Sequence, residues 1–118
     1  MVMQIDITFR GMPASIPAEM AARRWIERLR RVYADIIKCS VVVEIPHRHQ
    51  TRDQEFHVRI ELVVPDQVIS VSHDPGREEA RNDLYVAIAD AFRAARRQLQ
   101  QYATVRRREV KHHAGDAA

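Results

Sequence analysis

Four short segments of the sequence alternate apolar and polar residues with a period of two, and this alternation is the strongest constraint on the fold. A β-strand with such a pattern buries one face and leaves the other in water. The segments predicted to be strands are residues 3–10, 37–46, 54–64 and 67–73. One sheet built from them offers a single apolar side for other elements to cover.

Two further segments have helical periodicity, with apolar residues at steps of three and four. The first begins after Ser15, a capping residue, and runs to about Asp35. The second begins after Asp83, which can also cap a helix. Trp25 and Tyr33 lie on the apolar stripe of the first helix. We therefore expect both rings to pack in the core, with base stacking by either ring as the alternative.

The resulting element order is β-α-β-β-β-α. The first helix must cross over between the first two strands, which predicts a parallel pair there, whereas the short later connections predict antiparallel hairpins. The expected fold class is α+β, a two-layer sandwich in which a four-stranded mixed sheet carries both helices on one face. We expect residues 1–104 to form one domain, and residues 105–118 to form a basic, flexible C-terminal tail.

Membrane insertion, catalysis and cofactor binding find little support in the sequence. No stretch approaches the roughly 20 apolar residues that span a bilayer, and the first ten residues alternate as a strand does, so a cytoplasmic location is expected. The single Cys39 lies on the apolar side of a strand and is predicted to be an inert core residue. No nucleophile motif or phosphate-binding glycine loop occurs. We predict no enzyme, no cofactor and no small-molecule substrate.

Six histidines, among them His47, His49, His112 and His113, suggest a metal site, but their spacing is poor for this role. His47 and His49 lack the cysteine pairs or the helical histidine pair that usually accompany a zinc site. Exposed or RNA-contacting histidines are therefore favoured over metal ligands, and no metal site is predicted.

Arginine is concentrated on the outward faces of the two predicted helices. The net charge is only +3, but seven basic residues and one acid lie between Arg93 and Lys111. Guanidinium groups can bind two phosphate oxygens at once, so an anionic partner is indicated. The polar sheet face is mixed in charge and has no Phe, Tyr or Trp on which bases could stack. The alternative is that these arginines only face solvent and bind no partner.

Two short motifs, DLYVAI at residues 83–88 and RQL at residues 97–99, lie in the second predicted helix. They resemble the D-x-Y-x-A-I helix opening and the R-Q-L of the ribosome hibernation-promoting factor and ribosome-associated inhibitor family. Residues 39–49, 57–60 and 108–112 look like a proteobacterial branch, whose members often continue into a cold-shock-like domain. Ala89, Gln100 and Gln101 depart from the family, which has an acid at the first position and often lysines at the other two.

The resemblance implies that residues 1–104 are a ribosome-binding domain that binds small-subunit ribosomal RNA and blocks the channel for messenger and transfer RNA. The predicted RNA-binding residues lie on the two helices, in the tail and between the second and third strands. They are Arg23, Arg24, Arg28, Arg31, Tyr85, Arg93, Arg96, Arg97, Arg106, Arg107, Arg108, His47, Arg48 and His49.

Two alternatives remain open from the sequence. Tyr85 is equally well explained as a residue that packs at the rim of the core with a solvated hydroxyl. The whole chain is alternatively a protein-interaction module of the same fold that does not bind ribosomes. Self-association through an edge strand is compatible with the sequence but is not predicted.

Overall fold

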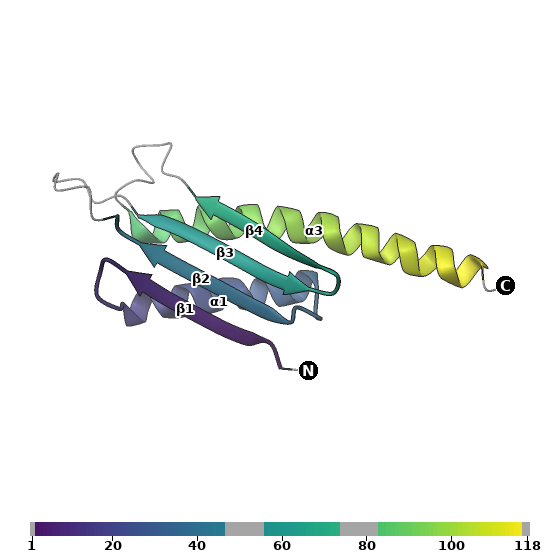
Figure 1. Cartoon of the computed structure of the whole chain (residues 1–118), viewed down its shortest axis with the longest axis horizontal. Helices are drawn as coiled ribbons and strands as arrows, with labels where there is room; N and C mark the ends of the chain where they lie inside the picture. The colour runs from purple at the N-terminus through teal and green to yellow at the C-terminus, as the bar shows by residue number, and fades with distance from the viewer. Residues whose placement is uncertain (1, 47–55, 74–82, 117–118) are drawn as a thin grey trace.

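The computed structural model describes residues 2–46, 56–73 and 83–116, and its elements follow the predicted order (Figure 1). Its strands are β1 (Gln4–Arg10), β2 (Lys38–Glu44), β3 (His57–Val64) and β4 (Gln67–His73), and its helices are α1 (Ile16–Val32) and α3 (Leu84–Asp116). The expected α+β fold class is confirmed.

The four strands form one mixed sheet in the order β1-β2-β3-β4. The β1–β2 pair is parallel and the two later pairs are antiparallel, as predicted. The register aligns Val41 with Ile60 and Ile60 with Val71, so the same face of each strand is apolar. Every second residue of β3 is buried, from Val58 to Val64, which confirms the predicted alternation.

Both helices cover that apolar face, and the opposite face of the sheet is open (Figure 1). The core between the two layers contains the fully buried side chains of Ile26, Leu29 and Phe92 from the helices. Ile60 and Leu62 face them from the central strand β3. The arrangement places the polar surfaces of α1 and α3 on the side of the molecule opposite the open sheet face.

Capping groups set the start of each helix where the sequence predicted them. The Ser15 hydroxyl accepts a hydrogen bond from the backbone N–H of Ala18, at 3.2 Å. The Asp83 carboxylate accepts hydrogen bonds from the N–H groups of Tyr85 (2.9 Å) and Val86 (3.3 Å). α1 ends at Val32, earlier than predicted, because the backbone of Tyr33 is extended.

The final helix differs from the prediction, because α3 continues as a helix to Asp116. The expected boundary at residue 104 has no counterpart in the secondary structure. Residues 105–114 contain neither proline nor glycine and are rich in arginine, a good helix former. Contacts with the β3–β4 turn also hold the helix at this point: the Tyr102 hydroxyl donates to the carbonyl of Pro65 (2.8 Å) and Arg106 pairs with Asp66 (3.0 Å). Beyond that turn, α3 projects past the sheet (Figure 1).

Candidate nucleic-acid interface

The contact between α1 and α3 is built on two stacked aromatic rings. Trp25 of α1 is half-buried and Phe92 of α3 is fully buried. Their rings are almost parallel, with centroids 6.0 Å apart and an angle of 10° between the planes. Offset stacking at this distance is a favourable aromatic geometry. It joins the two helices where their basic surfaces meet.

Two arginines, one from each helix, lie over the ring of Trp25. The guanidinium carbon of Arg28 is 4.6 Å from the ring centroid, and that of Arg93 is 5.7 Å from it. Both distances are within the range of cation–π attraction. Arg93 also pairs with Asp90, at 3.1 Å. The basic surfaces of α1 and α3 are therefore joined at Trp25.

On α1, the predicted RNA-binding arginines divide into two groups. Arg24, Arg28 and Arg31 are exposed, and their spacing of four and three residues places them along one side of the helix. None of these three forms an ion pair within the described part of the chain. Arg23 differs because it pairs with Glu19, at 3.3 Å.

On α3, the predicted residues also have different surroundings. Arg96 and Arg97 are exposed and form no ion pair with any described residue. Arg107 and Arg108 are exposed too, and the Arg107 side chain donates to the carbonyl of Ala103 at 3.3 Å. Arg106 instead forms an ion pair with Asp66 of the β3–β4 turn, so the charge of Arg106 is partly compensated.

Tyr85 and the loop residues complete the predicted set. Tyr85 lies in the first turn of α3 with half of its surface exposed. The loop residues predicted to bind RNA, His47, Arg48 and His49, lie outside the described residues. The structure therefore brings together one predicted arginine from each helix, Arg28 and Arg93, over the ring of Trp25. Trp25, which was predicted to pack in the core, also contacts two arginines, and no local pattern in the sequence indicates this contact.

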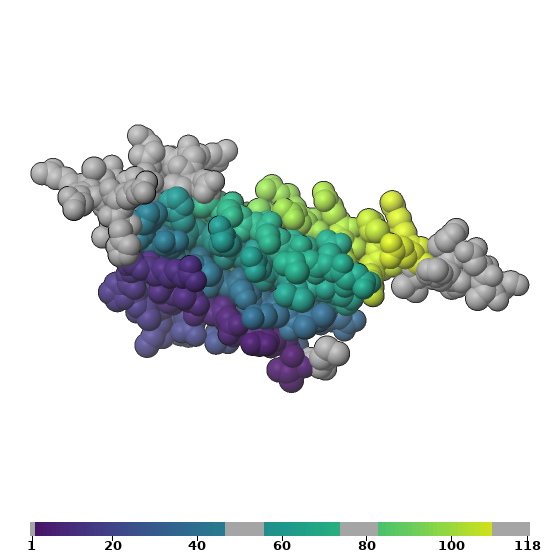
Figure 2. Space-filling view, viewed as in Figure 1, coloured from purple at the N-terminus to yellow at the C-terminus, as the bar shows by residue number. Residues whose placement is uncertain are grey.

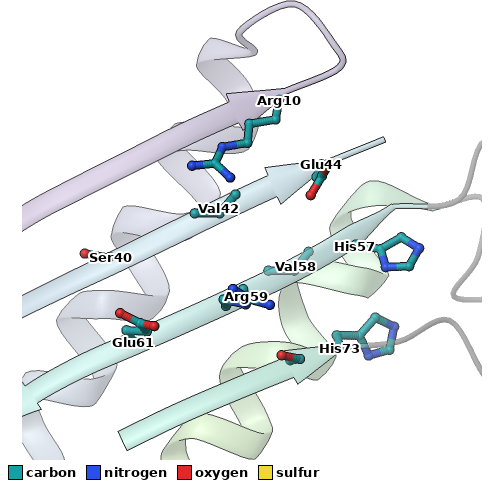
Figure 3. A pocket seen from close by; sticks show the side chains of 10 residues that line it. Arg10, Ser40, Val42, Glu44, His57, Val58, Arg59, Glu61 and His73 are labelled. Carbon is teal, nitrogen blue, oxygen red and sulfur yellow. The ribbon is translucent and has the colours of Figure 1, made fainter. Parts of the chain in front are cut away.

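The open face of the sheet has a different character. In the orientation of Figure 2, the side chains of the four strands form one surface, and α3 extends beyond it. A hollow on this face is lined by Arg10 and Arg59 together with Glu44 and Glu61 (Figure 3). Phe, Tyr and Trp are absent from its described lining. The lining therefore has the expected mixture of charges and lacks Phe, Tyr and Trp among its described residues.

The remaining chemical candidates are inert in the described part of the chain. Cys39 is fully buried in β2, and this burial raises the pKa of its thiol to about 12, so the nucleophilic thiolate is scarce at neutral pH. Among the described side chains, which end at residue 109, no three His, Cys, Asp or Glu residues are grouped to hold a metal ion. No described helix is both long and apolar enough to cross a membrane.

Comparisons with known proteins agree with this architecture. A family model described as "Sigma 54 modulation protein / S30EA ribosomal protein" matches residues 5–107. The structure of a ribosomal subunit interface protein from Coxiella burnetii is similar, with a TM-score of 0.70 and 16% identity over 86% of this chain and 99% of that one. The N-terminal domain of Thermus thermophilus Protein Y has a TM-score of 0.66 and 17% identity over 85% of this chain and 99% of its own. No curated protein matches significantly in sequence.

Proposed function

Because this chain belongs to the Sigma 54 modulation protein / S30EA ribosomal protein family, we propose that it is a cytoplasmic hibernation factor that inhibits translation by occupying the small ribosomal subunit. In this proposal it binds small-subunit ribosomal RNA and blocks the channel for messenger and transfer RNA. The Coxiella burnetii relative of the same fold is described as a ribosomal subunit interface protein, which supports a ribosomal partner.

The observation that carries the proposal is the set of unpaired arginines on the two helices. Arg24, Arg28 and Arg31 of α1 and Arg96 and Arg97 of α3 are exposed and form no ion pair with described residues. Both helices lie on the same side of the sheet (Figure 1). Charges of one sign on one surface add to a single field, which attracts a polyanion. Arginine also matches the geometry of phosphate oxygens.

The proposed mechanism is steric and needs no catalytic residue. Phosphate contacts position a protein on RNA without reading its sequence. The helix surface presents arginines for such contacts, and the described lining of the hollow on the open face contains no Phe, Tyr or Trp for stacking bases. Occupation of the channel is then sufficient for inhibition.

A protein-interaction module is the second candidate. The observation that favours it is the hollow on the open sheet face, which contains both Arg10 and Arg59 and the acids Glu44 and Glu61. A surface with both signs of charge suits a protein partner better than RNA. In that case the helix arginines contribute mainly to solubility.

Co-sedimentation with purified small subunits tests the proposal. Replacing Arg93, Arg96 and Arg97 together by Glu is expected to abolish co-sedimentation, and the double change Arg24→Glu and Arg28→Glu is expected to weaken it. The circular dichroism spectrum should stay unchanged, because all five side chains are exposed.

A matched control changes charge on the other side of the sheet. The double change Glu55→Gln and Glu61→Gln is expected to leave binding nearly unchanged, because Glu61 is on the open face. Glu55 lies outside the described residues, so Glu61→Gln alone is the control that rests on the structure. If the triple arginine variant co-sediments like the wild type, the helix surface does not bind RNA and the protein-interaction module is the better description.

A further inference from the structure

The single tryptophan of the chain lies beneath two cationic side chains that come from different helices. Stacking on the buried Phe92 holds the indole ring of Trp25 in place. The guanidinium carbons of Arg28 and Arg93 are 4.6 and 5.7 Å from the centroid of that ring. The distance between the two guanidinium carbons is therefore at most the sum of their distances from the ring centroid.

Two guanidinium groups that lie over the same ring repel each other because they carry like charge, and no described carboxylate pairs with both of them. Arg93 pairs with Asp90, whereas Arg28 forms no ion pair with a described residue. The attraction of each cation to the face of the indole offsets part of the repulsion. A phosphate group offsets it further, because its oxygens can accept hydrogen bonds from both guanidinium groups at once.

We propose that Arg28 and Arg93 form one binding site for a phosphate group of RNA, and that Trp25 is the positioning residue that holds both arginines there. The inference rests on the proposed function, since the phosphate is one in the backbone of ribosomal RNA. Trp25 orders both side chains before RNA arrives. Without this ring, the side chains of Arg28 and Arg93 would lose conformational entropy when RNA binds, and this cost would weaken the complex.

Stacking of an RNA base on Trp25 is a weaker explanation of the same geometry. Base stacking requires an accessible face of the ring. The ring of Trp25 is half-buried, is stacked on Phe92 and has two guanidinium groups over it. The site therefore presents cationic N–H donors to a ligand, which is the chemistry of phosphate recognition.

Binding of purified small subunits to Trp25→Leu and Trp25→Phe measures the positioning role, because neither change alters the net charge. The leucine variant is expected to lose roughly 5- to 30-fold in affinity, since two arginines must then be ordered on binding. The phenylalanine variant keeps an aromatic face for the cations, and should stay within about threefold of wild type. A residue that only packs would lower the melting temperature and leave the affinity of the folded protein unchanged.

Arg28→Glu and Arg30→Glu form a matched pair for the site itself. Both residues are exposed and lie on α1, but Arg30 pairs with Glu27 at 3.1 Å and has no recorded contact with Trp25. Reversal at Arg28 is expected to weaken small-subunit binding by roughly tenfold more than reversal at Arg30, because only Arg28 is proposed to touch the phosphate.

Fluorescence of Trp25 gives a local readout that is independent of ribosomes. A 12-nucleotide uridine RNA added at low salt is expected to change the emission of the wild type and of Arg30→Glu. The double variant Arg28→Glu and Arg93→Glu should show no change, although its tryptophan is retained. An emission change of equal size in that double variant would mean that RNA reaches Trp25 without the two arginines, and would overturn the proposed site.

The outcomes separate this inference from the proposed function. If Trp25→Leu binds small subunits as tightly as wild type while Arg28→Glu does not, Trp25 is not a positioning residue and the function stands. If Arg28→Glu and Arg30→Glu bind equally well, the phosphate site is wrong. If Trp25→Leu fails to fold, Trp25→Met, which has the same charge and also lacks an aromatic face, takes its place, and the fluorescence titration still tests the two arginines. A wild type that fails to bind small subunits contradicts the proposed function itself.

Discussion

At the residue scale, Cys39 shows how burial controls reactivity. Its side chain is fully buried in β2 between neighbouring strands, and its pKa is raised to about 12 by the loss of solvent. In the unfolded chain the thiol ionises near its ordinary pKa of 9.0. The unfolded state therefore binds fewer protons than the folded state above that pH, and folding stability must fall as pH rises.

This linkage predicts a difference between the wild type and Cys39→Ala. Between about pH 8 and about pH 10, the free energy of unfolding of the wild type should fall by about 1.4 kcal/mol more than that of the variant, because only the wild type gains a thiolate on unfolding. Urea denaturation at the two pH values measures this. As a control, the native thiol should resist a disulfide reagent at about pH 8 and react after unfolding. Equal pH dependence in both proteins would contradict the burial argument.

At the element scale, β3 is the strand on which the most packing depends. Ile60 is fully buried at its centre and is aligned with Val41 on one side and Val71 on the other. Replacing Ile60 by Ala should lower the free energy of unfolding by roughly 2 to 5 kcal/mol, because it removes buried methyl groups and leaves a cavity. Chemical denaturation measures the loss. The adjacent exposed residue provides the control: Arg59→Ala should change stability by less than about 0.5 kcal/mol. A loss below about 0.5 kcal/mol for Ile60→Ala would contradict the burial of Ile60 and would show that the opposite face of β3 packs in the core.

The elements themselves were largely predictable, for reasons that are local in the chain. Alternation with a period of two revealed all four strands, and β4 has the predicted bounds of residues 67–73. Capping groups at Ser15 and Asp83 located both helix starts. The helical extension of α3 was missed because a run of like charges resembles a flexible tail. Pairing of Arg106 with Asp66 is one of the contacts that hold it, and it joins residues 40 positions apart, which periodicity cannot reveal.

The candidate site was predictable only in part, because it depends on how two helices pack. Helical periodicity placed Arg23, Arg24, Arg28 and Arg31 together on the outward face of α1. The convergence of Arg28 and Arg93 over Trp25 follows from the stacking of Trp25 on Phe92. No local pattern links residues this far apart in the chain. The pairing of Arg23 with Glu19 was likewise compatible with the sequence but was not anticipated.

At the scale of the whole molecule, the distribution of charge matters more than its sum. The net charge of +3 is small. On the open sheet face, Lys38 pairs with Asp6 at 3.3 Å, and arginines and glutamates line the same hollow. On the helix side, the proposed RNA surface consists of six arginines, Arg24, Arg28, Arg31, Arg93, Arg96 and Arg97. Five of them lack an ion pair with described residues, and Arg93 is the exception. Salt should therefore weaken binding through the helix side more than it weakens binding through the open sheet face.

The dependence of binding on salt distinguishes the two candidate functions. The proposed RNA surface contains Arg24, Arg28, Arg31, Arg93, Arg96 and Arg97. If each neutralises one phosphate, counterion release from about six contacts should lower the affinity for small subunits roughly a thousandfold between about 50 and about 200 mM salt. Co-sedimentation at graded salt measures the slope of log affinity against log salt concentration.

Variants should change this plot in different ways. Trp25→Leu should shift the whole line to weaker binding with little change of slope, because it removes no charge, whereas each arginine reversal should make the slope shallower. A nearly flat line for the wild type would indicate docking through the mixed-charge sheet face, where few counterions are released.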